Sequence, residues 1–517
     1  MSFTSYWFVL AVGVIIFLYY IIPKRVQWMF LLAASYLIYA SAGWQCIVYI
    51  SITTLVTYIA ARVIDSLTQK RKRFFSENKL EKAEKKQYKE KIKKKQKCLV
   101  WMAIIAELCL LVMLKYSGFI GLKISDVFQG IIVPLGISFY TLQAIGYLID
   151  VYNEKYEAQR NYGKLALFMG FFPQLSQGPI SRYDDLSKTL YEMHGFDASV
   201  VALGAQRILW GYFKKLVIAD RVAVGLNTLL KAPSEYTGVY FIVAATFYAI
   251  QLYADFTGGI DIAIGIAQTL GIKLKENFVR PFFSKSIKEY WNRWHITMGS
   301  WFTDYVFYPV SVSKTFLKIS KRARNVLGDG IGKKVPVYLA TIIVWSLTGL
   351  WHGASWNFVV WGLANCVVIL ISQELIPIYR KFHKRFKVAD KMWYKMFCVV
   401  RTIILMSMLR MFDCFTDVTV TVKWFASIFI NCNPAVLWNG SLLHIGLTVE
   451  DYVIIILGVL ILVTVSMLQR KQSVRERIKH MPYPVRVAVW LSLFVVVILM
   501  GMYGQGYEAS DFIYNRF

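Results

Sequence analysis

Long apolar runs recur along the chain and are separated by shorter polar or basic segments. Each run approaches the roughly 20 residues that a helix needs to cross a lipid bilayer. The runs are continuous and do not alternate with polar residues, which argues against a membrane β-barrel. The pattern predicts an all-α, polytopic transmembrane helical bundle of about 10–12 spans, with re-entrant and interfacial helices. The main runs are Trp7–Ile22, Cys98–Leu114, Val239–Leu252, Val335–Leu347, Tyr452–Met467 and Val487–Met502.

Composition agrees with a membrane protein. Apolar residues form 57% of the 517 residues and charged residues only 17%, whereas about a quarter of the residues in soluble domains are charged. The first run begins almost at Met1 without a basic leader or a small-residue cleavage site, so we expect a permanent span. The seven cysteines show no CxxC or metal-ligand spacing. We therefore expect neither a disulfide framework nor a metal site.

Basic residues are concentrated in a few blocks, and the net charge is +28. Lysine and arginine in loops mark the cytoplasmic side of a membrane protein. We interpret residues 64–97 as a basic cytoplasmic insertion in a single membrane domain that covers residues 1–517. A nucleic-acid partner is the alternative for such a block, but the flanking spans favour contact with anionic membrane lipid. We expect membrane lipid and no nucleic acid as a partner.

The same blocks predict which side of the membrane each segment faces. Three apolar runs precede the basic insertion, so the N-terminus is expected on the outer side of the membrane. The blocks that begin at Lys314, Arg380 and Arg470 are also expected on the cytoplasmic side. The run between the first two of these blocks must therefore leave the cytoplasm and return, with the reversal near residues 349–355.

Some central segments are too polar to be simple spans. Residues 171–180 combine proline, glycine and amides, including Gln174, and such a backbone is tolerated at membrane depth only when it is buried in protein or lines a wet cavity. Asp255 and Asp261 lie six residues apart among apolar residues. Intramembrane acids usually pair with cations, so a structural role is favoured over catalysis.

Two motifs place a histidine beside tryptophans: WNRWH at residues 291–295 and GLWHG at residues 349–353. A titratable imidazole in or near a bilayer is costly and by default suggests a functional site. Histidine is also suited to moving a proton near neutral pH. For the first motif, an interfacial amphipathic helix is the alternative. For His352, a core histidine hydrogen-bonded between helices is an equal alternative to proton transfer.

A series of short motifs extends over much of the chain: residues 134–140 (PLGISFY), 147–150 (YLID), 172–175 (FPQL), 178–183 (GPISRY), 253–256 (YADF), 261–265 (DIAIG), 277–278 (NF), 291–301 and 349–356. In this order the motifs resemble the membrane-bound O-acyltransferase superfamily, in its bacterial alginate O-acetyltransferase-like branch. The resemblance extends over nearly the whole length and is weakest in the basic insertion and after about Arg380.

The resemblance implies a helical bundle around a central tunnel, with its catalytic region at residues 277–371. His352 matches the family's catalytic histidine and His295 its second motif histidine. A sugar hydroxyl needs a base before it can attack a thioester, and the attack needs donors where the oxyanion forms. The residues expected to bind substrate or line the tunnel are Asn292, Arg293, Trp294, Trp351, Asp255, Asp261 and Gln174.

The resemblance also suggests substrates and partners. The expected reaction moves an acyl group, favoured as acetyl, from cytoplasmic acetyl-CoA or another acyl thioester to an extracytoplasmic polysaccharide. No bound cofactor is expected, and a secreted serine-hydrolase-like acetyltransferase is the expected partner. The alternatives are D-alanyl transfer to teichoic acid, a polytopic transporter or flippase, and a noncatalytic scaffold. A transporter predicts inverted repeats, and the sequence shows no convincing repeat.

Overall fold

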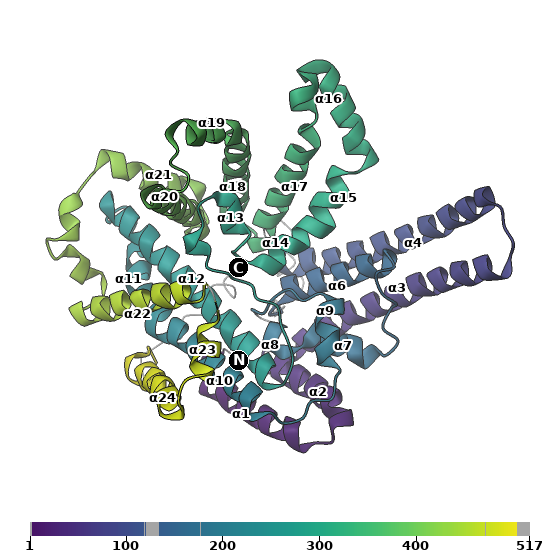
Figure 1. Cartoon of the computed structure of the whole chain (residues 1–517), viewed down its shortest axis with the longest axis horizontal. Helices are drawn as coiled ribbons and strands as arrows, with labels where there is room; N and C mark the ends of the chain where they lie inside the picture. The colour runs from purple at the N-terminus through teal and green to yellow at the C-terminus, as the bar shows by residue number, and fades with distance from the viewer. Residues whose placement is uncertain (1–2, 118, 120–133, 176, 471, 504–517) are drawn as a thin grey trace. The chain divides into compact units, whose positions relative to one another are not determined.

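The computed structural model describes the chain except residues 1–2, 118, 120–133, 176, 471 and 504–517 (Figure 1). The part described is helical and contains no strand, which confirms the predicted all-α class. Within it, seven helices are long and apolar enough to cross a membrane, and two shorter helices, Tyr6–Ile21 and Val418–Ile430, are also apolar. A span number of 10–12 and a central tunnel remain predictions. The seven are Trp44–Glu77, Lys82–Tyr116, Val239–Thr269, Val335–His352, Trp356–Glu374, Val449–Leu468 and Tyr483–Met500.

The chain forms two compact units. The first unit comprises residues 1–205 and 263–275, and the second comprises residues 206–262 and 276–517. The predicted catalytic region at 277–371 lies entirely in the second unit. The described helices of the first unit are α1 (Tyr6–Ile21), η1 (Lys24–Val26), α2 (Gln27–Ala40), α3 (Trp44–Glu77), α4 (Lys82–Leu111), η2 (Val112–Tyr116), α6 (Ile137–Tyr152), α7 (Tyr162–Gly170), α8 (Phe172–Leu175), α9 (Tyr183–Leu190), the first part of α10 (Ala198–Tyr212) and the end of α12 (Val239–Thr269).

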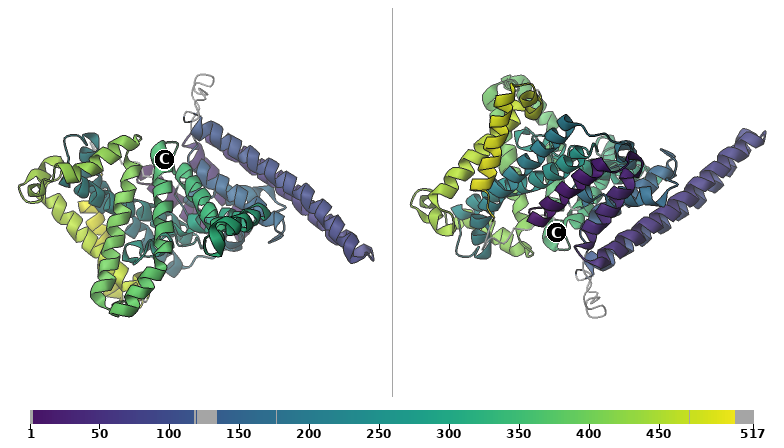
Figure 2. Two further views of the ribbon diagram at one scale, coloured as in Figure 1. Left: turned by 90° about the horizontal axis from the view of Figure 1, so that it is seen from above. Right: turned by 90° about the horizontal axis from the view of Figure 1, so that it is seen from below.

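The basic segment at 64–97 forms the paired ends of α3 and α4, which run side by side as a hairpin (Figures 1 and 2). A helix of 34 residues such as α3 is about 51 Å long, well beyond the roughly 30 Å hydrocarbon core of a bilayer. The charged ends therefore extend out of the apolar region. Glu154 ties both arms together, because its carboxylate pairs with Arg71 of α3 at 2.6 Å and with Lys93 of α4 at 2.9 Å.

The second unit contains a longer series of helices around the two histidine motifs. Its π-helical segment η3 (Phe213–Ala219) packs on the C-terminal helices α22 and α24. The elements in chain order are η3, α11 (Asp220–Lys231), α12 (Val239–Thr269, as far as Ile262), η4 (Pro281–Phe283), α13 (Ile287–Trp291), α14 (Ile296–Phe302), η5 (Thr303–Phe307), α15 (Tyr308–Ser311), α16 (Lys314–Gly332), α17 (Val335–His352), α18 (Trp356–Glu374), α19 (Ile376–Phe386), α20 (Met392–Arg410), η6 (Met411–Cys414), α21 (Val418–Ile430), η7 (Pro434–Leu437), η8 (Ser441–Ile445), α22 (Val449–Leu468), α23 (Val474–Lys479) and α24 (Tyr483–Met500).

The chain reverses direction between α17 and α18, as the sequence predicts. These helices pack closely because glycines stand at their crossing. A Cβ atom at Gly349 would lie 2.3 Å from the carbonyl oxygen of Phe358, and one at Gly362 would lie 2.4 Å from that of Trp345. Only hydrogen fits at such approaches. The crossing holds the end of α17, and with it His352, inside the protein.

Candidate active site

His295 lies in a tight turn between α13 and α14. Its backbone is left-handed, with φ 48° and ψ 52°, a conformation that costs energy for a residue with a side chain and persists only when the surroundings enforce it. An extended segment enforces it here. The amide of Val279 donates to the carbonyl of Arg293, and the amide of Ile296 donates to the carbonyl of Asn277, both at 3.0 Å.

The side chain of Asn277 orients the His295 ring. Asn277 Oδ1 accepts hydrogen bonds from the Thr297 amide at 3.0 Å and from Thr297 Oγ1 at 2.9 Å. Both polar atoms of the Asn277 amide lie near Nδ1 of His295: Asn277 Nδ2 is 3.2 Å away and Asn277 Oδ1 is 3.3 Å away. Because Oδ1 already accepts two bonds, we assign Nδ2 as the donor to Nδ1. The neutral ring then carries its proton on Nε2.

His295 is fully buried, and its surroundings keep it neutral. Burial, with a smaller effect from the positive charge of Arg410, lowers the pKa of His295 to about 3. Aromatic rings surround the imidazole, including Phe256 at a centroid distance of 5.0 Å. A neutral imidazole with a proton on Nε2 can donate a hydrogen bond to a substrate oxygen.

His352 is the last residue of α17 and is 4% exposed. Its ring packs edge-on against that of Trp361 of α18, with the ring centroids 4.8 Å apart. It lies nearly parallel to the ring of Phe358, at a centroid distance of 6.3 Å. Gly353 is needed directly after it, because a Cβ atom there would lie 2.2 Å from the Phe358 ring. The helix end and the packed rings thus hold the imidazole in a confined apolar site.

The structure brings the two histidine motifs together in the second unit. The ring centroid of Trp351 lies 5.9 Å from that of His295 and 5.2 Å from that of His352, so one indole packs against both imidazoles. Trp291 of the first motif packs on Trp361, which itself touches His352. Two motifs far apart in the sequence therefore share one aromatic shell.

Arg410 is a component of this shell that the sequence reasoning missed. Its guanidinium lies 5.3 Å from the ring centre of Trp291, 5.1 Å from that of Trp294 and 4.8 Å from that of Trp361. It pairs with Asp413 at 3.1 Å, and both side chains are nearly inaccessible. The signal in the sequence was an arginine and an aspartate three residues apart inside an apolar run.

The neighbours of His295 have different environments. Trp294 is buried and stacks on Tyr290 at 5.5 Å. Arg293 forms an ion pair with Glu289 four residues earlier, at 2.6 Å. Asn292 follows α13 as its C-terminal cap and is exposed. Substrate contacts by these residues remain predictions.

Both aspartates of α12 form ion pairs, in agreement with the favoured structural interpretation. Asp255 accepts from Lys215 Nζ at 2.6 Å, and Asp261 accepts from Arg207 Nε at 2.8 Å and from Lys214 Nζ at 2.5 Å. Asp261 also lines a cavity.

Gln174 belongs to the first unit, where it is buried and donates from Nε2 to the Phe168 carbonyl at 2.8 Å. Among the described residues, no group of three or more histidine, cysteine, aspartate or glutamate side chains could hold a metal ion.

Comparisons with known proteins agree with the sequence resemblance. Residues 160–412 match the family model described as MBOAT, membrane-bound O-acyltransferase family. The chain is 31% identical over 375 residues to a protein of Azotobacter vinelandii named "Probable alginate O-acetylase AlgI", covering 69% of this chain and 66% of that one. It is 30% identical over 314 residues to the peptidoglycan O-acetyltransferase of Helicobacter pylori, covering 54% of this chain and 56% of that relative.

A third relative, the teichoic acid D-alanyltransferase of Bacillus subtilis, is 28% identical over 271 residues, covering 52% of this chain and 65% of the relative. The matches thus span about half to two thirds of the length of these relatives.

Proposed function

Residues 160–412 of this chain belong to the membrane-bound O-acyltransferase family, and from that premise we propose that the protein is a membrane O-acyltransferase. It moves an acyl group, best supported as acetyl, from a cytoplasmic thioester to a polysaccharide outside the membrane. The observation that carries the proposal is the placement of His295 and His352 in one buried aromatic shell, joined by Trp351. The names of the alginate and peptidoglycan relatives support acetyl transfer to a polysaccharide.

The two histidines take different roles in this reaction. His352 accepts the proton of the acceptor hydroxyl while the hydroxyl oxygen attacks the thioester carbonyl. The negative charge that develops on the carbonyl oxygen needs hydrogen-bond donors at that position. His295, neutral and protonated on Nε2, supplies one. When the tetrahedral intermediate collapses, the C–S bond breaks and the thiol takes the proton back from His352.

Two features of the proposal rest on the resemblance to the family alone. The donor is acetyl-CoA or another cytoplasmic acyl thioester, and a secreted serine-hydrolase-like acetyltransferase completes the transfer to the polymer. D-alanyl transfer to teichoic acid is the second candidate, because a D-alanyltransferase is among the relatives. The two donors are separated with membrane vesicles that receive either radiolabelled acetyl-CoA or a carrier protein loaded with radiolabelled D-alanine. The donor that the protein uses is the one whose thioester loses its label.

The test of the function is substitution of His352. His352→Ala and His352→Gln should each lower acyl transfer in vesicles by about 10²–10⁴-fold, the usual contribution of general acid–base catalysis. His480→Gln is the matched control, because His480 is exposed and lies after α23, outside the shell. Each variant should insert into the membrane and, after extraction in detergent, elute as the unsubstituted chain does, which shows that it folds. Near-normal transfer by either His352 variant would refute the role.

A further inference from the structure

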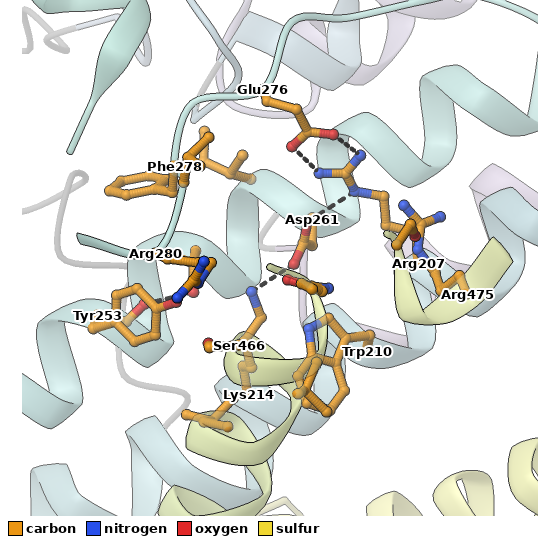
Figure 3. A pocket seen from close by; sticks show the side chains of 17 residues that line it. Arg207, Trp210, Lys214, Tyr253, Asp261, Glu276, Phe278, Arg280, Ser466 and Arg475 are labelled. Atoms are coloured by element: carbon orange, nitrogen blue, oxygen red, sulfur yellow. Dashed lines mark hydrogen bonds and ion pairs between the residues drawn. The ribbon is translucent and has the colours of Figure 1, made fainter. Parts of the chain in front are cut away.

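A cavity in the same unit as the histidine shell has a different, charged lining. It measures about 290 Å³, roughly ten times the volume that one molecule occupies in liquid water. Its wall comes from η3 and the end of α10, from α12, from residues 276–280, and from α22 with the segment after it. Four cationic and two acidic side chains line it (Figure 3): Arg207, Lys214, Arg280, Arg475, Asp261 and Glu276.

Two of the cations are already balanced by the two acids. Arg207 binds Glu276 through both terminal nitrogens at 2.6 Å and Asp261 through Nε at 2.8 Å. Lys214 occupies the other oxygen of Asp261 at 2.5 Å. Figure 3 shows this network along one side of the cavity. The carboxylates of the wall are thus engaged by Arg207 and Lys214, and the lining as a whole carries an excess of positive charge.

Arg280 lines the cavity close to other cationic side chains. Among the described residues, no carboxylate forms an ion pair with it. Burial, and then the positive charges of Arg293 and Arg470, lower its pKa. Its backbone is left-handed, with φ 52°, an enforced conformation of the kind that clusters at binding sites. Figure 3 shows its side chain beside Tyr253. An arginine held in this way at a cationic cavity is suited to an anion, and arginine matches phosphate geometry especially well.

Apolar space adjoins the charged cavity at Arg280. A smaller cavity of about 80 Å³ shares Tyr253, Arg280, Leu462 and Ser466 with it and is otherwise lined by aliphatic and phenylalanine side chains. The charged cavity also lies at the end of α22, a candidate span, where the basic block after Arg470 begins. Phosphate groups are found at such a boundary between apolar and cationic surroundings.

We propose that this cavity binds a phosphate group, with the guanidinium of Arg280 as the main contact and that of Arg475 as the second. The source is either a phospholipid headgroup, whose chain would follow the apolar side, or a soluble phosphate compound. The proposal does not depend on acyl transfer, since it concerns binding only. The ion pairs of Arg207 with Asp261 and Glu276 neutralise the carboxylates of the wall, so that these repel the anion less.

The experiment measures binding of two probes to the purified full chain. In nanodiscs of phosphatidylcholine, inorganic pyrophosphate is titrated by calorimetry at low salt. In detergent, retention of phosphatidylglycerol against phosphatidylcholine is measured by native mass spectrometry. Binding of pyrophosphate alone identifies a soluble phosphate as the source, and selective retention of phosphatidylglycerol identifies a lipid. Arg280→Gln should lower the affinity for the probe that binds by at least about tenfold, because a charge-assisted contact is removed.

Arg475→Gln tests the same site from a separate segment, and it should weaken binding several-fold even if Arg280→Gln fails to fold. Arg385→Gln is the matched control: Arg385 is exposed on α19 and does not line the cavity. The proposal is overturned if neither probe binds the unsubstituted chain, or if a folded Arg280→Gln or Arg475→Gln variant binds as well as Arg385→Gln.

Discussion

At the scale of single residues, the proton position on His295 depends on Asn277. The amide donates to Nδ1 and so leaves the proton on Nε2, where the proposed oxyanion contact needs it. Asn277→Asp keeps an oxygen for Thr297 but replaces the donor with an acceptor. The neutral ring of His295 should then carry its proton on Nδ1, and a carboxylate at this distance should raise its pKa. We expect Asn277→Asp to lose most acyl transfer near neutral pH.

The pH dependence of this variant separates positioning from structure. Below the raised pKa of His295 the ring is an imidazolium, and Nε2 again carries a proton. The ratio of Asn277→Asp activity to unsubstituted activity should therefore rise as pH falls. In the unsubstituted chain His295 stays neutral, because its pKa of about 3 lies far below the assay range. A ratio that stays flat across pH would show that Asn277 acts only by holding the fold.

The candidate site could be predicted in part at this scale. The tryptophan–histidine motifs indicate His295 and His352 because their residue types are costly in an apolar chain. The partners of these residues depend on contacts between distant segments. Asn277 is visible in the sequence as half of a short motif, but its hydrogen bond to His295 exists only once residues 277–279 lie beside 293–296. Arg410 reaches the shell from a different helix.

At the scale of elements, the position of His352 depends on the close crossing of α17 and α18. Gly362→Ala would place a Cβ 2.4 Å from the Trp345 carbonyl, and neither backbone can yield without separating the helices. Overpacking of this kind typically costs about 1–3 kcal/mol. We expect a lower unfolding temperature in detergent and reduced acyl transfer, since His352 moves with the end of α17.

A matched glycine substitution distinguishes crowding from the general effect of replacing glycine in a helix. A Cβ atom added to Gly330 of α16 would have nothing within 4 Å, so Gly330→Ala should leave stability unchanged or slightly higher. Equal unfolding temperatures for Gly362→Ala and Gly330→Ala would contradict the importance of the crossing. The reversal itself was predictable from charge blocks at both ends of the run, whereas the glycine contacts were not, because they require the register of two helices.

At the scale of the whole molecule, the long apolar helices and the basic blocks were predictable because both follow directly from composition. The division into two compact units was not, since it follows from how distant segments pack: residues 263–275 join the first unit although α12 begins in the second. The apolar pattern also gives no sign of the charged cavity, whose residues come from several separate segments.

The proposed direction of acyl transfer requires a defined orientation of the molecule in the membrane. The basic arms of α3 and α4 predict that Ser76 is cytoplasmic. The three apolar segments before these arms, which are α1, α2 and the first part of α3, predict that the N-terminus is outside. The basic blocks that begin at Lys314, Arg380 and Arg470 are also predicted on the cytoplasmic side. Ser441 is predicted outside. With this orientation His352 lies on a helix hairpin that leaves the cytoplasm and returns, as the proposed reaction between an inner thioester and an outer acceptor requires.

Single cysteines at Ser76 and Ser441, in a chain stripped of its seven free cysteines, test this orientation. In intact cells an impermeant maleimide should label Ser441→Cys and leave Ser76→Cys unlabelled, and Ser76→Cys should react once the cells are opened. Ser76 is exposed on its helix, so protection before lysis reports the membrane barrier and not burial in the protein. Labelling of Ser76→Cys in intact cells, with Ser441→Cys protected until lysis, would reverse the orientation and with it the proposed path of the acyl group.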